Sequence, residues 1–371
     1  MTATVIGVGD SKAVKRYSAF LAVDTGRKSY FGKKFTGNGE DAQTPLQRLS
    51  HLENDAGDQI SYDLVAQLKM KPVQGDNTLR GREEDLKFYT DNLYIDQLRG
   101  GVNTGGKMTR KRTIHDLRKI ARARQSDWWA RLKDETIFMY LSGARGVNSD
   151  FIEDSSFTGY AGNAFVAPDD KHILYGNNAT AKNNVDSADI MNLALIDRAV
   201  ARADVMGGGT TKIPSMQPCM IDGEEHFVLV MHSWQEYDLR AASGSTWLDI
   251  QKAAAAAEGR NNPMFKGGLG MYNNVILHKH KAAILFNDYG SGVNLNAARA
   301  LFMGRQAGVI AYGSPGNDQH YDWNEELEDR GNQVVITTGC TFGVKKTAFT
   351  IDGTSRDFGV IALDTYVADP S

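Results

Sequence analysis

The chain has 371 residues, of which 41% are hydrophobic and 23% charged, as expected for a folded globular protein of two or three domains. Its net charge of −3 argues against a dedicated nucleic-acid-binding protein, which usually carries a marked basic excess. Two cysteines are too few for a disulfide framework, and the sequence shows neither a signal-peptide pattern nor an apolar run of about 18 residues. Composition therefore predicts a protein that is made in the cytosol and does not span a membrane.

Residues 1–55 are predicted to form a loose arm. Polar and glycine-rich pieces such as GKKFTGNGEDAQTP interrupt short apolar clusters, and no helical period lasts beyond one turn. A disordered leader is the alternative interpretation.

The next segment predicts a long two-stranded hairpin. Apolar and polar residues alternate over residues 59–68, and a second extended run covers residues 86–98. The tip between them, QGDNTLRGREED, is charged and contains glycine. Because an isolated hairpin is marginally stable in water, we expect this one to lie across a neighbouring subunit.

A long amphipathic helix is predicted from residue 114 to about residue 141, with Thr113 as its N-cap and the glycines of SGARG at its end. The positions expected to pack inward are Leu117, Trp128 and Leu132. Trp129 is the alternative to Trp128, since adjacent residues lie about 100° apart on a helix.

The rest of the chain predicts a mixture of short elements. Residues 147–186 are loop-rich, with strand fragments at 164–166 and 172–174. Helices are expected at 188–205, 234–242, 246–258 and 298–304. Strands are expected at 227–231, 275–280, 284–286, 307–312, 333–338, 343–349 and 358–367. Helices and strands are partly segregated, so the predicted class is α+β.

Motifs for catalysis or cofactor binding are weak. The glycine-rich segments at residues 7–10 and 207–212 lack the spacing of phosphate-binding loops, and a helix stop explains the second better. Cys219 and Cys340 lack a nearby cysteine, and Cys340 is expected to be a small buried thiol. The acidic stretch DWNEELEDRGN is expected to be an exposed helix or loop. No catalytic, cofactor-binding or metal-binding residue is predicted.

Histidines supply the one pattern that resembles a metal site. His278 and His280 share one face of a predicted strand, and His320 with Asp318 and Asp322 would complete a ligand set. Three lysines surround the pair, at positions 266, 279 and 281. These charges favour a solvated strand face over a metal site.

A basic run marks the front of the predicted long helix. It consists of Arg110, Lys111, Arg112, Arg118, Lys119, Arg122 and Arg124. Three interpretations stay open: a surface facing DNA, an ionic contact with a neighbouring subunit, and a solvated helix face whose arginine stems cover apolar surface.

Several segments make the pattern specific. The hairpin with IDQLRGGV, the helix with DWWARL and SGARG, the segment ARALFMGRQAGVIAYG, and KKTAF followed by DFGVIALDTYV resemble the N-four-type family of phage major capsid proteins over residues 45–368. The resemblance implies the Hong Kong 97-type fold, with an N-terminal arm (1–55), an extended hairpin or E-loop (56–112), a P-domain with a spine helix (113–222), an A-domain (223–332) and C-terminal strands of the P-domain (333–371).

The resemblance also implies a function. Subunits of this family would self-assemble through hexamers and pentamers into an icosahedral shell enclosing the phage genome, in the host cytoplasm. Implied partners are portal and scaffold or decoration proteins, and packaged double-stranded DNA by non-specific contact only, with no membrane. The alternatives are another virion structural protein, either a decoration protein or one fused to a scaffold, and a metal-dependent hydrolase using the histidines near residues 278 and 320.

Charged and aromatic residues of the hairpin and of the front of the long helix are the candidates for subunit contacts. They are Lys69, Lys71, Arg80, Arg82, Glu83, Glu84, Asp85, Tyr94, Arg99, Arg118 and Arg122. Some capsids of this fold join subunits by isopeptide bonds from a hairpin lysine. The hairpin lysines here lie at or beside a wet tip that keeps amines protonated, so we expect no covalent cross-links.

Overall fold

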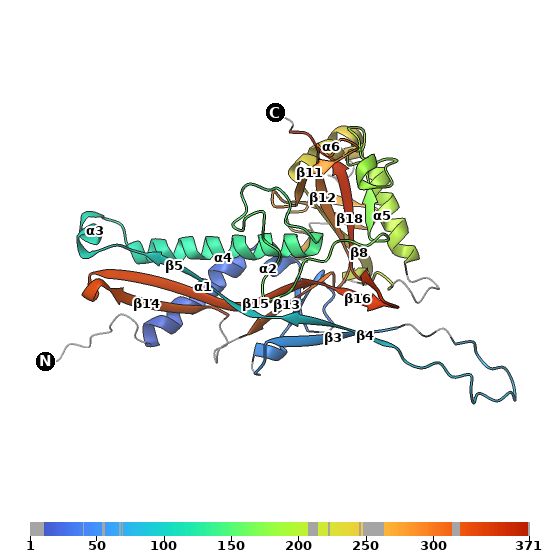
Figure 1. The fold of residues 1–371 in the computed structure, drawn as a ribbon, viewed down its shortest axis with the longest axis horizontal. Helices are drawn as coiled ribbons and strands as arrows, with labels where there is room; N and C mark the ends of the chain where they lie inside the picture. The colour runs from blue at the N-terminus through green and yellow to red at the C-terminus, as the bar shows by residue number, and fades with distance from the viewer. Residues whose placement is uncertain are drawn as a thin grey trace.

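The computed structural model describes residues 11–39, 41–53, 56–66, 68, 70–206, 214–221, 223–244, 246–247, 263–313 and 320–369 (Figure 1). The subunit is elongated. A long helix lies along a long sheet, a compact second sheet rises at one end, and a hairpin loop extends away from the body (Figure 1). This mixture of sheets and helices confirms the predicted α+β class.

The long sheet has six strands, drawn from both ends of the chain. Their order is β1-β2-β13-β15-β14, and β5 pairs with β15. The bounds are β1 Thr36–Asn38, β2 Leu46–Leu49, β5 Asp96–Asn103, β13 Gly308–Gly313, β14 Asp322–Glu328 and β15 Gln333–Lys346. β15 is the axis of the sheet, because β13 and β14 pair with successive parts of it and β5 pairs with it as well.

The long helix α4 (Leu117–Ser142) begins later than predicted. Thr113 is not its N-cap, because that hydroxyl accepts only the His115 N–H in a local turn, whereas the Asp116 carboxylate accepts the N–H groups of the first turn. A separate short helix, α3 (Lys107–Arg112), precedes it. The predicted end is confirmed: Gly143 caps the helix at φ 68°, a conformation that favours glycine.

The inward face of α4 differs from the prediction by one position. Leu132 is buried as expected, but Leu117 and Trp128 are only half-buried, and Trp129 is fully buried. The Trp129 indole N–H donates to the Thr338 hydroxyl of β15 at 2.9 Å. Trp128 lies against Gly100, where a Cβ would come within 2.8 Å of its ring.

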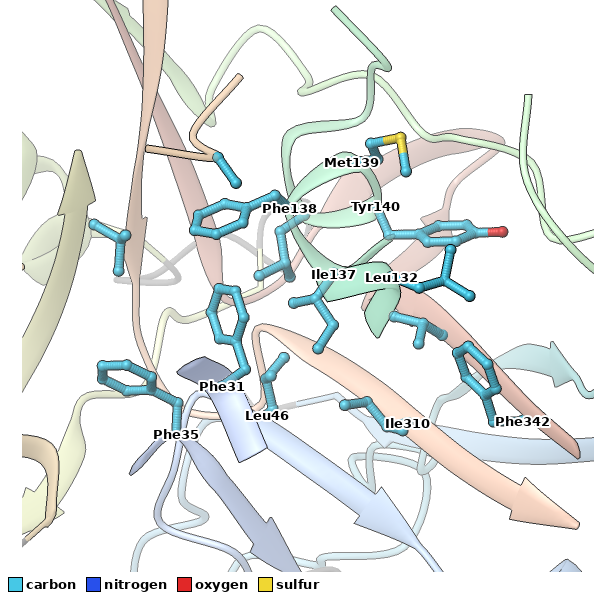
Figure 2. Close-up of a cluster of buried hydrophobic side chains, with 14 of the residues drawn as sticks. Phe31, Phe35, Leu46, Leu132, Ile137, Phe138, Met139, Tyr140, Ile310 and Phe342 are labelled. Atoms are coloured by element: carbon cyan, nitrogen blue, oxygen red, sulfur yellow. The ribbon is translucent and has the colours of Figure 1, made fainter. Parts of the chain in front are cut away.

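The described part of residues 1–55 is not a loose arm; that prediction was wrong. Helices α1 (Ser11–Lys28) and α2 (Tyr30–Lys34) pack on α4, and Phe31, Phe35 and Leu46 enter the main core (Figure 2). The α1 face turned inward carries Ser18, Leu21 and Thr25. Two of these three residues are polar, so the hydrophobic period is too weak to reveal a helix.

The compact sheet has eight strands in the order β6-β18-β12-β8-β10-β9, with β11 on β12 and β7 on β8. Their bounds are β6 Ile173–Tyr175, β7 Cys219–Ile221, β8 Glu224–Met231, β9 Gly270–Tyr272, β10 Val275–Lys279, β11 Leu285–Tyr289, β12 Leu295–Met303 and β18 Val360–Tyr366. Helices α5 (Leu193–Val205) and α6 (Ser233–Ser243) lie beside it (Figure 1).

Two predictions in this region were wrong. Of the segment 298–304, residues 298–303 belong to β12 and not to a helix, because they are buried between β8 and β18 and tertiary pairing overrides their helical propensity. Helix α5 begins five residues late, at its N-cap Asn192. Asp186 and Asp189 hold a local turn by hydrogen bonds that compete with the helix. Of the helix predicted at 246–258, only residues 246–247 lie within the described part.

The predicted hairpin is confirmed as an antiparallel pair, β3 (Gln59–Val65) and β4 (Phe88–Tyr94). The second run continues after a break at Ile95 into β5, which joins the long sheet. A second small hairpin, β16 (Ala348–Ile351) with β17 (Thr354–Asp357), packs against β4.

Candidate assembly surface

The base of the β3–β4 hairpin is fixed to the subunit body. Ile60 and Leu93 are buried in a small apolar cluster with residues of β2 and β13. The Asp91 carboxylate accepts hydrogen bonds from the Tyr62 hydroxyl at 2.6 Å and from Lys345 of β15 at 2.5 Å. Burial, aided by the charge of Asp91, raises the pKa of Tyr62 well above 10, so the phenol stays a donor. The hairpin therefore leaves the body in a defined direction.

Beyond its base, the hairpin exposes apolar side chains that have no cover within the described chain. Phe88 is 58% exposed, and similar exposure is found along both arms of the loop. The set consists of Val65, Leu68, Met70, Leu79, Leu86 and Phe88. Isolated exposed apolar residues are ordinary, but several on one thin element mark an interaction surface.

Sequence reasoning missed this apolar set. It treated the tip as a charged and wet element because charged residues dominate the segment at 80–87. The sequence signal that could have revealed this set is the recurrence of leucine, methionine and phenylalanine in a segment that has no core of its own to bury them.

The charged residues predicted for subunit contacts do gather at this tip. Lys71, Arg80, Arg82 and Asp85 are exposed. Glu83 accepts the Gly81 N–H at 2.6 Å, and hydrogen bonds from backbone groups lower the pKa of this carboxyl. Glu84 is half-buried, and Lys69 lies outside the described residues.

The other candidates lie on the body. Tyr94 and Arg99 are exposed, and the Tyr94 backbone N–H and C=O both bind the Asn163 side-chain amide. Arg118 of α4 forms an ion pair with Glu325 at 2.5 Å, and Arg122 lies 3.7 Å from Asp24 of α1. The two α4 arginines thus stabilise the subunit's own fold, and their contact with a neighbour stays a prediction.

The acidic stretch was misjudged. Residues 322–328 form strand β14 on the edge of the long sheet and are neither a helix nor a loop. Glu325 is buried because it pairs with Arg118 and accepts the Trp323 indole N–H at 3.0 Å. The charge pattern alone did not show that α4 supplies the counter-ion.

The solvated-face interpretation is wrong for His278, and Asp318 of the alternative ligand set lies outside the described residues. His278 is fully buried, with its Nε2 atom 2.8 Å from the Met264 carbonyl oxygen, and His280 packs against the rings of Tyr30 and Phe138. Burial lowers the pKa of both imidazoles to about 4. Within the described residues, no group of three potential metal ligands occurs.

Cys219 and Cys340 are free and buried, which confirms the prediction for Cys340. In the described part of the chain, none of the helices combines the length and apolarity needed to cross a membrane.

Comparison with known proteins identifies the family. The family model described as phage capsid protein matches residues 5–369. The major capsid protein of Pseudomonas phage KPP25 is 27% identical over an alignment of 364 residues, and the match covers 89% of each chain. The capsid of Ralstonia phage GP4 is 50% identical and superimposes over 100% of both chains with a TM-score of 0.87.

A more distant structure shares the fold. The cyanophage Pam1 capsid asymmetric unit is 22% identical, covers 89% of this chain and 91% of its own, and has a TM-score of 0.67. The β3–β4 hairpin, whose loop exposes apolar side chains, fits a shell subunit. The chain therefore belongs to the phage capsid protein family, as a shell-forming major capsid protein of a tailed phage with the Hong Kong 97-type fold.

Proposed function

We propose that copies of this chain assemble through hexamers and pentamers into a closed icosahedral shell around the phage genome, and that the chain has no enzymatic activity. The observation that carries this proposal is the β3–β4 hairpin, whose base is fixed and whose loop exposes a run of apolar side chains. An element of this kind gains stability only when another surface covers it. Rings of subunits supply that surface through head-to-tail contacts that close.

We propose that the hairpin is the E-loop and lies across a neighbouring subunit. The exposed apolar side chains would supply the buried centre of that contact, and the charged residues at the tip would form its rim. The positive and negative tip residues, Arg80, Arg82, Glu83 and Asp85, would set the register against charges on the partner.

The domain assignment follows the two sheets. We propose that α4 and the long sheet form the P-domain, and that the compact sheet with α5 and α6 forms the A-domain. Strands β13 and β14, placed in the A-domain by sequence, would then belong to the P-domain. Strand β18, placed with the C-terminal P-domain strands, would complete the A-domain sheet.

We also propose the remaining partners from the family likeness. Portal and scaffold or decoration proteins would contact the shell, and packaged double-stranded DNA would touch it only non-specifically. A net charge of −3 supports weak contact with DNA, since strong binding depends on cationic residues that neutralise phosphates. Assembly would take place in the host cytoplasm.

The experiment compares the full chain with a variant that lacks residues 73–85. Both are expressed and imaged by negative-stain electron microscopy, and circular dichroism reports folding. The full chain should form shells or rings, whereas the deletion should give a folded, soluble subunit that does not close shells. Normal shells from the deletion would show that the hairpin tip is not an assembly element.

A point variant sharpens the test. Phe88→Ser removes one exposed apolar ring from the hairpin, and Val205→Ser, at a residue 74% exposed at the end of α5, is the matched control. Only the hairpin variant should impair assembly. Equal impairment by both variants would indicate a general loss of apolar surface as the cause.

A further inference from the structure

A cavity of about 380 Å³ lies between the N-terminal helices and the long sheet. Thr25 of α1 lines one side, Lys133 of α4 another, and Arg48 of β2 and Tyr312 of β13 a third. His320 and Tyr321, just before β14, complete the wall. Four elements distant in sequence thus converge on one space, which contributes nothing to the proposed hairpin contact.

Three basic side chains in this wall gather around one aromatic ring. The imidazole of His320 stacks on the Tyr312 ring at 4.3 Å, the Lys133 ammonium lies 4.4 Å from the ring centre, and the Arg48 guanidinium 5.3 Å. The aromatic face stabilises the cations but carries no charge that would neutralise them.

The described carboxylates near the cavity do not neutralise both of its cations, Arg48 and Lys133. Arg48 pairs with Glu53 at 2.6 Å, but Lys133 has no carboxylate oxygen of the described residues within 4.0 Å. Its ammonium donates to the Tyr312 hydroxyl at 3.2 Å and interacts with the neutral Tyr321 and Cys340 side chains. The adjacent Asp134 carboxylate is directed elsewhere, since it accepts hydrogen bonds from Ser29 and the backbone of α2. A buried ammonium that lacks a counter-ion is costly.

The wall also offers hydrogen-bond donors that have no acceptor. Arg48 Nη2 lies 2.7 Å from His320 Nε2, and because a guanidinium only donates, Nε2 must accept. The neutral ring therefore carries its proton on Nδ1, which is buried and has no partner among the described residues. Burial and the charges of Arg48 and Lys133 lower the pKa of His320 to about 4, which keeps the ring neutral.

The Thr25 hydroxyl is a second donor that has no partner within the described residues. This side chain is 2% exposed, and Oγ1 finds no hydrogen-bond partner within the described structure. Buried polar atoms of folded proteins are nearly always hydrogen-bonded, to protein or to another bound species. Excess positive charge, unused donors and an open volume together define the complement of a small anion that has several acceptor atoms.

We propose that this cavity binds a phosphate-class oxyanion, with Lys133 and Arg48 supplying charge and His320 Nδ1–H and the Thr25 hydroxyl supplying neutral hydrogen bonds. Charge-assisted hydrogen bonds to an oxyanion are about twice as strong as neutral ones. The bound ion connects α1, α4 and the long sheet. It therefore stabilises the folded subunit, and this stabilisation rises with the logarithm of the phosphate concentration once that exceeds the Kd.

The test uses the full chain in phosphate-free buffer and inorganic phosphate as the probe. Isothermal titration calorimetry, with sodium chloride at matched ionic strength as the reference titration, should show one phosphate bound per chain. Lys133→Met should abolish binding. Thr25→Val removes one hydrogen bond to the anion and should weaken binding about tenfold.

Controls keep the result interpretable. Thr25→Val should fold at least as well as the parent without phosphate, because the hydroxyl it removes has no partner. Arg124→Gln changes an arginine of the same helix that is 80% exposed, and its phosphate affinity should equal that of the parent. The proposal is overturned if the parent shows no phosphate-specific heat, or if Thr25→Val binds phosphate as tightly as the parent. Where Lys133→Met does not fold, Thr25→Val decides.

Discussion

Trp129 and Trp128 give the sharpest test of how α4 is oriented on the long sheet. The Trp129 ring is fully buried, lies 5.4 Å from the Tyr321 ring and donates to the Thr338 hydroxyl. Truncating a buried tryptophan costs about 3–5 kcal/mol, and the lost hydrogen bond adds about 1 kcal/mol. Trp129→Ala should therefore destabilise the subunit by roughly 4–6 kcal/mol.

Trp128→Ala is the matched comparison. A tryptophan buries about 150–250 Å², so a half-buried ring loses about half of that area, or about 2–3 kcal/mol at about 25 cal/mol per Å². The free energy of unfolding of a domain is only about 5–15 kcal/mol. The soluble yield of the Trp129 variant should therefore fall much further than that of the Trp128 variant. Urea denaturation of unassembled subunits, followed by far-ultraviolet circular dichroism, measures both costs. An equal or larger loss for Trp128→Ala would refute this orientation.

The remaining predictions concern backbone, pH and assembly. Gly143→Ala should cost more stability in urea denaturation than Gly162→Ala: both glycines have positive φ, but only at Gly143 would a Cβ meet a backbone carbonyl oxygen. The pKa of His278 is lowered from 6.5 to about 4, so its stabilisation is complete above pH 6.5 and falls by roughly 2 kcal/mol at pH 5, a loss that His278→Gln should remove. The pKa of Asp134 is raised to about 6, which opposes this loss as pH falls through 6, so Asp134→Asn should make the urea midpoint drop more steeply. Phe88→Ser should leave the urea midpoint of unassembled subunits unchanged, and a shifted midpoint would show that the ring serves the subunit fold. Finally, mature particles should give a single monomer band in denaturing electrophoresis, whereas multimers that survive reductant and heat would contradict the absence of cross-links.

Local periodicity was enough to predict the elements whose pattern is strong. The alternation along β3 and β4 and the long segment of α4 without proline or glycine are patterns of residues close in sequence. The hairpin and the long helix could therefore be predicted. Helix α1 could not, because two of its three described buried side chains, Ser18 and Thr25, are polar. The helix predicted at 298–304 was wrong because the local pattern there is helical, whereas pairing with β8 and β18 holds residues 298–303 in a strand.

Charges were harder to interpret than apolar patterns. Glu325 and Arg118 are 207 residues apart, and nothing near either one indicates that they pair. His278 is next to lysines in sequence, yet strand alternation points Lys279 outward and the imidazole inward, so the neighbouring charges were misleading. The basic cavity could not be predicted from the sequence either, because its walls come from four distant segments.

The position of β15 has a consequence for synthesis. Residues 333–346 pair with β5, more than 200 positions earlier, and with β13 and β14. Pairings this distant in sequence make folding slow, and they cannot form before the last strand exists. While the ribosome is still producing the first 330 residues, the long sheet lacks its central strand. The base of the hairpin then lacks the β15 contacts that fix it to the subunit body. Incomplete chains therefore cannot enter a growing shell, and translation itself delays assembly until each subunit is whole.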